Sequence, residues 1–335
     1  MILLKKYQEE AVDNLLANTY KLLKKPGARH TQVLKAPTGS GKTVMMAAFL
    51  NKLCEELPDR VELPRREVAF VWIAPNKLHL QSYMSLKNYF AELRSIKPIQ
   101  FEDVTDNALK PNEVLFVNWE SINKEKNVMV RETETGKSLY RYVAGARMNE
   151  VEVVVIIDEE HMFANTKTAK RTAEVLQRLY PKIEIRVSAT PQTKTDYLTL
   201  VERDDVVAQE MIKEGIVLNP ALDSYAQNDR SLDQVLIDVA LEKRNQIAEA
   251  YQRLDKNINP LLLIQLPNDT SEDTSVEDKK IIELVTLHLE NYCGISTQNG
   301  RLAVWLSKQK ENLENIEEYD NGVEVLLFKQ AIALG

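Results

Sequence analysis

The stretch Thr31–Leu53, TQVLKAPTGSGKTVMMAAFLNKL, decides the fold of this chain. It begins with a short apolar strand that ends at Lys35, passes through a glycine-rich turn, and continues from Val44 as a helix rich in Ala, Met and Leu. The turn, residues 36–43, matches the phosphate-loop pattern GxxxxGK[ST], except that Ala36 replaces the first glycine. A strand, a phosphate loop and a helix in this order predict an α/β domain that binds phosphate groups.

The residue types of this loop indicate how it would hold a nucleoside triphosphate. Small residues let backbone N–H groups close around phosphate oxygens at the N-terminus of the following helix, where the dipole favours negative charge. We predict that Lys42 reaches the β- and γ-phosphates and that the hydroxyl of Thr43 binds the bridging Mg²⁺. The remaining loop residues that we expect to bind ATP are Thr38, Gly39, Ser40 and Gly41.

A second candidate segment is an acidic cluster that follows the apolar run Val153–Ile157 and reads Asp158-Glu159-Glu160-His161. Ligands of open α/β sheets bind at the carboxyl ends of the strands. We predict that Asp158 holds Mg²⁺, directly or through water, and that Glu159 orients and deprotonates the attacking water. An acidic trio after a strand is often only a solvated loop, but the preceding phosphate loop favours a catalytic role.

A third segment, Ser188-Ala189-Thr190, also stands at the end of a predicted strand and is followed by Pro191. The hydroxyl groups of Ser188 and Thr190 can hydrogen-bond the carboxylate cluster and relay a change in phosphate occupancy. By itself this triplet is a common turn. Its order and spacing after the acidic cluster favour a coupling role.

The rest of the first half alternates strands and helices. A helix is predicted over Lys5–Lys25, where apolar residues recur at helical spacing before Pro26-Gly27. Further strands are predicted at Val68–Ala74, Val114–Asn118, Val151–Asp158 and Ile183–Ser188. Near-continuous apolar runs are typical of central strands in a parallel sheet that is covered on both faces.

The chain of 335 residues favours two domains, which we place at residues 1–225 and 226–335. The second would hold a long helix over Leu232–Leu254 and three strands, Leu261–Leu266, Leu302–Leu306 and Val323–Phe328. Residues 124–148 are charged and polar, and we interpret them as a surface insertion, with a hairpin as its expected form.

Composition excludes several classes of protein. No apolar run approaches the roughly 18 residues of a membrane span, and the N-terminus lacks the pattern of a secretory signal, so we expect a cytoplasmic protein. The net charge of −7 argues against a broad basic surface for nucleic acid, although local contacts to phosphate need no such surface. Cys54 and Cys293 stand far apart without a CxxC spacing, and we interpret both as structural thiols.

Together, Tyr7-Gln8, the phosphate loop, the DEAH-like segment 158–161 and the triplet 188–190 resemble the ordered motifs of superfamily-two helicases and translocases. Finer matches resemble the motor subunit of type III restriction enzymes, and the resemblance spans nearly the whole chain. They read FVNWES at residues 116–121, HMFAN at 161–165, EGIV at 214–217 and FKQAIALG at 328–335.

The resemblance implies a RecA-like first domain, followed by a second RecA-like domain that is truncated. It assigns Gln8, with Tyr7 beside it, to the adenine base, and His161 to the link between the hydrolysis centre and the rest of the motor. Trp119 is open to two interpretations, a nucleic-acid contact or core packing. The resemblance also implies nucleic-acid-binding residues, with the last two sensing both ligands: Pro75, Asn76, Gln81, Asn118, Lys329 and Gln330.

The function that the resemblance implies is an ATP- and Mg²⁺-dependent translocase on duplex DNA that works with a methyltransferase subunit of a restriction system. Alternatives are another superfamily-two DNA or RNA helicase, or a non-hydrolysing interaction module controlled by nucleotide. The family's arginine-bearing last motor motif and its nuclease domain would follow Gly335. We therefore expect a truncated motor, without nuclease activity and with low ATPase activity.

Overall fold

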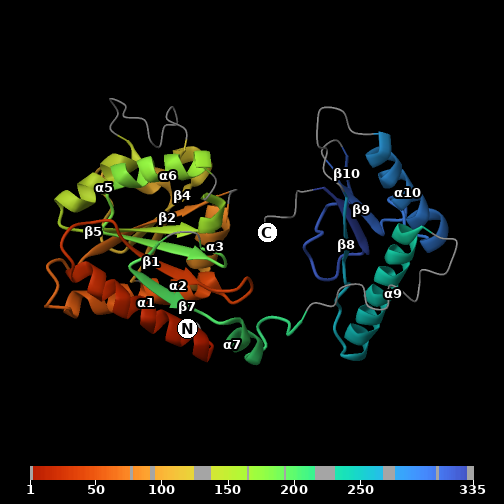
Figure 1. Ribbon diagram of the computed structural model, residues 1–335, viewed down its shortest axis with the longest axis horizontal. Helices are drawn as coiled ribbons and strands as arrows, with labels where there is room; N and C mark the ends of the chain where they lie inside the picture. The colour runs from red at the N-terminus through yellow and green to blue at the C-terminus, as the bar shows by residue number, and fades with distance from the viewer. Residues whose placement is uncertain are drawn as a thin grey trace. The chain divides into compact units, whose positions relative to one another are not determined.

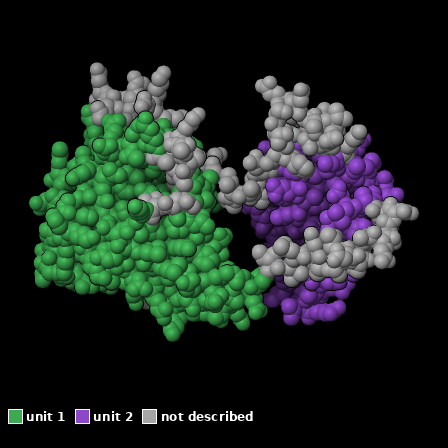
Figure 2. Space-filling model, viewed as in Figure 1, with its two compact units in different colours: residues 1–215 green, residues 216–335 purple. Residues whose placement is uncertain are grey.

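The computed structural model describes residues 3–75, 78–90, 95–123, 137–163, 166–191, 194–215, 231–266, 276–306 and 309–329. The chain divides into two compact units, residues 1–215 and residues 216–335 (Figure 2). This division falls earlier in the chain than the boundary after residue 225 that we expected from the sequence.

Unit 1 is built on a seven-stranded sheet with the order β3-β4-β2-β5-β6-β1-β7, and each of its neighbouring strands pairs in parallel (Figure 1). The strands are β1 (His30–Lys35), β2 (Val68–Ala74), β3 (Lys97–Ile99), β4 (Glu113–Asn118), β5 (Glu152–Asp158), β6 (Ile183–Ser188) and β7 (Tyr197–Leu200). The α/β fold with a parallel sheet and flanking helices, expected from the sequence, is confirmed.

Helices cover both faces of this sheet (Figure 1). Helices α1 (Lys6–Lys24), α2 (Lys42–Glu56) and α3 (Leu78–Tyr89) pack on one face; α5 (Leu139–Met148) and α6 (Thr166–Leu179) pack on the other. Two short helices, α4 (Trp119–Ile122) and α7 (Arg203–Ala208), complete the α-helices described in unit 1. Successive residues of β2 alternate between the two cores, with Phe70 and Trp72 on the first and Val71 and Ile73 on the second. This alternation explains why the central strands are apolar at every position.

Helix α5 corrects one expectation. We expected residues 124–148 to form a surface insertion in the shape of a hairpin, but Leu139–Met148 is a helix. Its side chains Leu139, Tyr142, Val143 and Ala146 are buried in the second core. The charged and polar residues before it concealed this spacing of apolar positions. Residues 124–136 lie outside the described part of the chain.

Unit 2 contains a four-stranded sheet with the order β10-β9-β11-β8, in which β10 is antiparallel to β9 and the other pairs are parallel. The strands are β8 (Leu262–Gln265), β9 (Leu302–Trp305), β10 (Lys310–Glu311) and β11 (Val325–Phe328). Helices α9 (Leu232–Arg253) and α10 (Val276–Cys293) pack against it through a core that includes Ile237, Leu241, Leu289 and Leu327. The sequence did not predict the short edge strands β3, β7 and β10, because an edge strand is not apolar on both faces.

In the described part of the chain, no helix is both long enough and apolar enough to cross a lipid bilayer.

Candidate nucleotide-binding site

Three of the predicted segments meet at one edge of the unit 1 sheet. Strand β6 lies between β1 and β5, and all three run in the same direction. Lys35, the last residue of β1, pairs with Ser188 of β6, and Asp158 of β5 pairs with Val187. The phosphate loop, the acidic cluster and the triplet 188–190 therefore leave the sheet side by side, at the edge where α/β proteins bind ligands.

The phosphate loop depends on two glycines in the left-handed region of backbone conformation. Gly39 has φ 82° and Gly41 has φ 81°. A Cβ atom on Gly41 would lie 2.6 Å from Nε2 of Gln8, and one on Gly39 would lie 2.9 Å from Cγ2 of Ile212. Gly41 is also the N-cap of α2, so this conformation directs the loop into the helix N-terminus.

Tyr7 and Gln8, both buried at the start of α1, form hydrogen bonds with the phosphate loop. The Tyr7 hydroxyl donates to the Ser40 carbonyl oxygen at 2.8 Å, and Gln8 Nε2 donates to the same oxygen at 3.0 Å. Gln8 Oε1 accepts from the backbone N–H of Lys5 at 2.9 Å. Both ends of the Gln8 amide are therefore engaged within the protein. Donation from Nε2 to an adenine would require one of its bonds to exchange, whereas Oε1 has a second lone pair that can accept from an adenine amino group. The adenine-reading role of Gln8 stays a prediction.

The loop has the features that a phosphate group requires. Lys42 and Thr43 are half-buried at the first two positions of α2, where backbone N–H groups have no partner within the helix. The Ser40 hydroxyl is buried and has no hydrogen-bond partner among the described residues. A buried polar atom without a partner is unfavourable, and binding of an anionic, oxygen-rich ligand beside it offers one. The residues present therefore fit a nucleotide phosphate.

Asp158 is the buried carboxylate of the site, with 9% of its surface exposed. Burial raises its pKa from the ordinary value of 3.8 to about 6, and repulsion from Glu159 adds to this shift. The Glu159 backbone N–H, which donates to Asp158 Oδ1 at 3.0 Å, and the positive charge of Lys42 oppose the shift. A carboxylate held in this way would gain from a divalent cation, because a nearby positive charge stabilises its ionised form.

A chain of polar contacts leads from the acidic cluster to the end of β6. Glu159 adopts a left-handed conformation with φ 53°, and its Oε2 atom lies 3.3 Å from Nδ1 of His161. The same nitrogen lies 3.2 Å from Ser188 Oγ, which accepts from the backbone N–H of Thr190 at 3.1 Å. The expected link between the triplet and the acidic cluster thus passes through the imidazole of His161, and Thr190 joins it through its backbone.

Glu160, whose role the sequence left open, is buried beneath the site with 3% of its surface exposed. It accepts from Arg186 Nη1 of β6 at 3.2 Å, and Arg186 Nη2 contacts Glu184 at 2.9 Å. Glu184 is itself paired with Arg29 at 3.2 Å. Sequence reasoning missed this group of charges; the available signal was the pair of charged residues inside the otherwise apolar strand 183–188.

The residues predicted to bind nucleic acid have mixed surroundings. Pro75 is buried at the end of β2, where its carbonyl oxygen accepts from the Leu78 N–H at 2.9 Å and starts α3. Gln81 is exposed on α3, and Asn118 Oδ1 accepts from the Glu120 N–H at 2.8 Å as the cap of α4. Because β2 and β4 are neighbours and Ala74 pairs with Asn118, Pro75 and Asn118 lie at the same edge of the sheet.

The remaining residues predicted to contact nucleic acid are Lys329, Asn76 and Gln330, and Trp119 had two interpretations. Lys329 follows β11 in unit 2, and its backbone N–H donates to the Trp305 carbonyl oxygen at 3.4 Å. Asn76 and Gln330 lie outside the described residues. Trp119 is 5% exposed and belongs to the core beside β4, so of its two interpretations the structure supports core packing.

The fold and the site define a phosphate-loop α/β protein with a parallel sheet. Residues 1–193 match the family described as "Type III restriction enzyme, res subunit". This match covers more than half of the 335 residues and lies within unit 1. The chain belongs to this family.

Two solved structures are similar to the chain at low sequence identity. A hypothetical ATP-dependent RNA helicase from Sulfolobus tokodaii is 12% identical with a TM-score of 0.32, over 99% of this chain and 84% of that chain. The Hef helicase domain from Pyrococcus furiosus is 13% identical with a TM-score of 0.40, over 97% of this chain and 85% of that chain. No curated protein sequence matches the chain.

Proposed function

We propose that this chain is the motor portion of a type III restriction endonuclease subunit, which hydrolyses Mg-ATP to move along duplex DNA. The observation that supports this most strongly is the pairing of Lys35 with Ser188 and of Asp158 with Val187 across β1, β6 and β5. It gathers the phosphate loop, the acidic pair and the His161 link at one edge. Membership of the restriction family favours DNA as the track and a methyltransferase subunit as the partner.

In this proposal the N-terminus of α2 is the phosphate site. Backbone N–H groups at this helix N-terminus would face the phosphate oxygens, and Lys42 would neutralise the β- and γ-phosphates. The Thr43 hydroxyl and Asp158 would hold Mg²⁺, which would supply positive charge to the phosphates during hydrolysis. Tyr7 and Gln8 keep the loop in its open, left-handed form through the Ser40 carbonyl.

Glu159 is the proposed general base. It stands next to the Mg²⁺ ligand Asp158, and its own N–H group fixes the Asp158 carboxylate. Its left-handed backbone turns the side chain toward His161 rather than along the strand. The imidazole can therefore orient the Glu159 carboxylate, and the carboxylate accepts a proton from the attacking water.

The same imidazole is the proposed start of coupling. His161 contacts both Glu159 and Ser188, so a shift of the carboxylate on ATP hydrolysis would reach the end of β6. From there it would pass to Thr190 and the chain that follows. DNA contacts are proposed for Gln81 and Asn118 on unit 1, together with Asn76, Pro75, Lys329 and Gln330. A cytoplasmic location also stays a prediction.

The test is the ATPase rate of the chain with duplex DNA, single-stranded DNA or single-stranded RNA. We expect Lys42→Ala to weaken binding of Mg-ATP severely, because it removes a charge-assisted contact to phosphate. Lys52→Ala is the matched control, since Lys52 lies in the same helix and its ion pair among the described residues is with the exposed Asp13. Unchanged affinity in Lys42→Ala would exclude this loop as the nucleotide site.

Glu159→Gln tests the chemistry separately from binding. This variant should bind Mg-ATP normally but turn it over on the order of 10²-fold more slowly, because it lacks the general base. Glu55→Gln, at the far end of α2, is the control. Stimulation by single-stranded RNA but not by duplex DNA would instead favour an RNA helicase, and binding without any turnover would favour a nucleotide-controlled module.

A further inference from the structure

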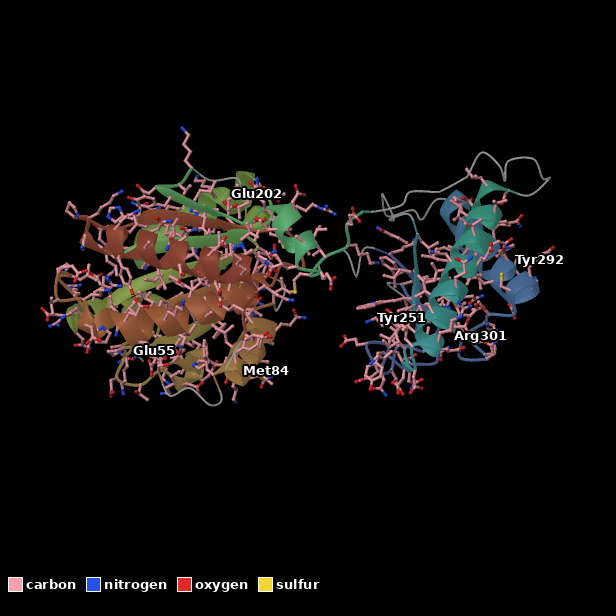
Figure 3. The ribbon with its side chains drawn as sticks, turned by 90° about the horizontal axis from the view of Figure 1, so that it is seen from below. Glu55, Met84, Glu202, Tyr251, Tyr292 and Arg301 are labelled. Atoms are coloured by element: carbon pink, nitrogen blue, oxygen red, sulfur yellow. The ribbon has the colours of Figure 1, made fainter. Side chains whose placement is uncertain are left out.

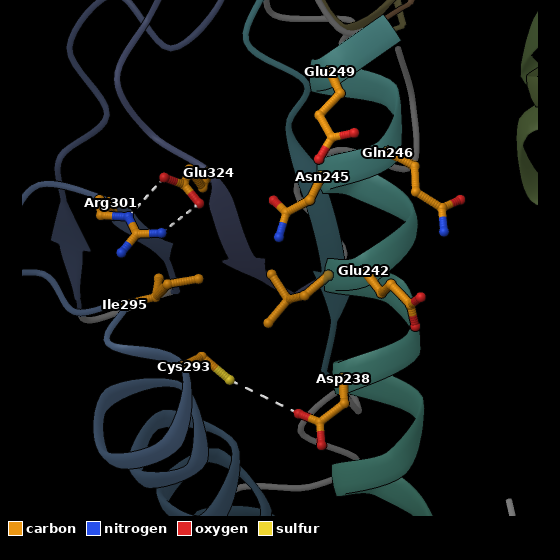
Figure 4. Close-up of a pocket in the computed structure, with 10 residues that line it drawn as sticks. Asp238, Glu242, Asn245, Gln246, Glu249, Cys293, Ile295, Arg301 and Glu324 are labelled. Carbon is orange, nitrogen blue, oxygen red and sulfur yellow. Dashed lines mark hydrogen bonds and ion pairs between the residues drawn. The ribbon is translucent and has the colours of Figure 1, made fainter.

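Unit 2 contains a pocket of about 490 Å³ between α9 and the chain that follows α10 (Figure 4). Asp238 reaches it from α9, opposite Cys293, the last residue of α10, and Ile295, which follows that helix. The Cys293 thiol points across the pocket toward the Asp238 carboxylate, 3.9 Å from Oδ1 (Figure 4). The side chains of Asp238 and Cys293 therefore contact each other and are both accessible from the pocket.

The third polar side chain of this group is that of His288. His288 is buried on α10, and its Nε2 atom lies 2.7 Å from Asp238 Oδ1. The carboxylate oxygen, the imidazole nitrogen and the thiol sulfur all lie within 4.8 Å of one another. Tyr292 stacks on the imidazole at 5.3 Å between ring centroids and lies at the outer surface of unit 2 (Figure 3). The three groups thus converge from two helices on one point.

The donor atoms select a class of ligand. Thiolate sulfur and imidazole nitrogen bind zinc-type transition metals, whereas Mg²⁺ and Ca²⁺ take oxygen ligands. Tetrahedral Zn²⁺ with its usual bond lengths separates neighbouring ligand atoms by roughly 3.3 to 3.6 Å. The separations from Asp238 Oδ1 to the imidazole nitrogen and to the thiol sulfur, 2.7 and 3.9 Å, lie on either side of this range, and the imidazole nitrogen and the sulfur lie within 4.8 Å of each other.

The charges around the pocket also suit a cation. Arg301 is the lining residue with a positive charge, and Glu324 binds it at 2.6 and 2.9 Å. Glu242 stands one helical turn after Asp238 and is also among the residues that line the pocket. A fourth coordination position on the open side would be filled by water, as in zinc sites that have three protein ligands.

We propose that Asp238, His288 and Cys293 form a binding site for a zinc-type divalent metal ion, with its fourth position open to the pocket. When the metal binds, the Cys293 S–H bond breaks, a sulfur–metal bond forms, and the proton leaves to solvent through the pocket. The proton of His288 moves from Nε2 to Nδ1 by tautomer exchange, and the hydrogen bond between Nε2 and Asp238 Oδ1 is replaced by one bond from each atom to the same ion. This site is separate from the Mg²⁺ site proposed in unit 1.

The test is a titration of the whole chain with Co²⁺, in the absence of nucleotide and Mg²⁺. Thiolate coordination of Co²⁺ gives a near-ultraviolet charge-transfer band, and tetrahedral geometry gives intense visible bands. We expect both bands to saturate at a single equivalent and to disappear when Zn²⁺ displaces the Co²⁺. The Cys54→Ala variant, which lacks the buried thiol of unit 1, and Asp158→Asn should keep these bands.

Variants of the cluster decide the outcome. Cys293→Ser should lose the charge-transfer band, and Asp238→Asn should bind Co²⁺ at least tenfold more weakly while its amide can still accept from His288. Far-ultraviolet circular dichroism of each variant is the control for correct folding. The proposal is overturned if the chain gives no thiolate band, if the band survives in Cys293→Ser, or if Asp238→Asn binds Co²⁺ with unchanged affinity. Because Asp158→Asn is measured in parallel, these results are independent of the proposed motor function.

Discussion

Replacing Glu160 with alanine tests how unit 1 is stabilised beneath its acidic cluster. Glu160 and Glu184 are nearly fully buried, and Arg186 lies between them with 14% of its side chain exposed. Arg29 contacts Glu184 from β1's N-terminal side. These four side chains carry two positive and two negative charges, so the group is neutral. Glu160→Ala leaves it with an uncompensated positive charge in a buried position.

The magnitude follows from this change in charge. Removing one partner of a buried ion pair typically costs about 3 to 5 kcal/mol, because the remaining charge is buried without compensation. Arg186 keeps its 2.9 Å contact with Glu184, so we expect the lower end, about 3 kcal/mol. Glu160→Ala combined with Arg186→Met removes both charges and should recover part of this loss, since the remaining pair, Glu184 and Arg29, is again neutral.

The assay is urea unfolding followed by tryptophan fluorescence. The chain has three tryptophans, of which Trp72 and Trp119 are buried in unit 1 and Trp305 belongs to unit 2. A Trp305→Phe background therefore makes the signal specific for unit 1. The control is Glu10→Ala, which removes a surface ion pair with Lys6 and should leave the midpoint unchanged, because exposed pairs contribute little.

A loss below about 1 kcal/mol in Glu160→Ala would refute this reasoning, since it would place the charges in effective contact with water. The same conclusion would follow if the double variant were no more stable than Glu160→Ala alone.

Two further predictions concern the nucleotide site. Gly41→Ala should weaken Mg-ATP binding far more than Gly27→Ala does in a fluorescent-nucleotide titration. Both glycines have φ 81°, but only the Cβ on Gly41 meets another side chain, Nε2 of Gln8 at 2.6 Å, so equal effects would contradict the clash. Asp158→Asn should stabilise unit 1 by about 2 to 3 kcal/mol at pH 7, because the folded pKa of about 6 lies above the ordinary 3.8. Below pH about 4 the Asp158 carboxyl is protonated in the folded state, and the stability that this proton contributes is fully present. This contribution is lost as the pH rises through about 6, because the buried carboxyl then ionises. The gain from Asp158→Asn should therefore vanish at pH about 4, and a gain that does not depend on pH would contradict the assigned pKa.

Local sequence was sufficient where backbone chemistry and a short-range pattern determine the structure. The predicted strand Val68–Ala74 has the same bounds in the structure, and the predicted helices at Lys5–Lys25 and Leu232–Leu254 differ from α1 and α9 only at their ends. The phosphate loop belongs to the same class, because its glycines and its position before a helix are properties of consecutive residues. Apolar runs on β2 and β5 also indicated a sheet covered on both faces.

Tertiary structure decided how residues far apart in the chain use their side chains. The sequence could not distinguish core packing of Trp119 from an exposed contact, because both use an aromatic residue after a strand. It predicted an insertion where α5 forms, since the charged and polar residues before the helix concealed its spacing of apolar positions. Glu160 contacts Arg186 only because separate elements pack together. The same is true of Asp238, which lies beside His288 and Cys293. The sequence by itself determined the fold class and the phosphate loop, which depend on local periodicity and backbone freedom. The partners of the buried charges were decided only by the tertiary structure, because a charge in the interior is stabilised by whichever opposite charge or polar atom folding places beside it.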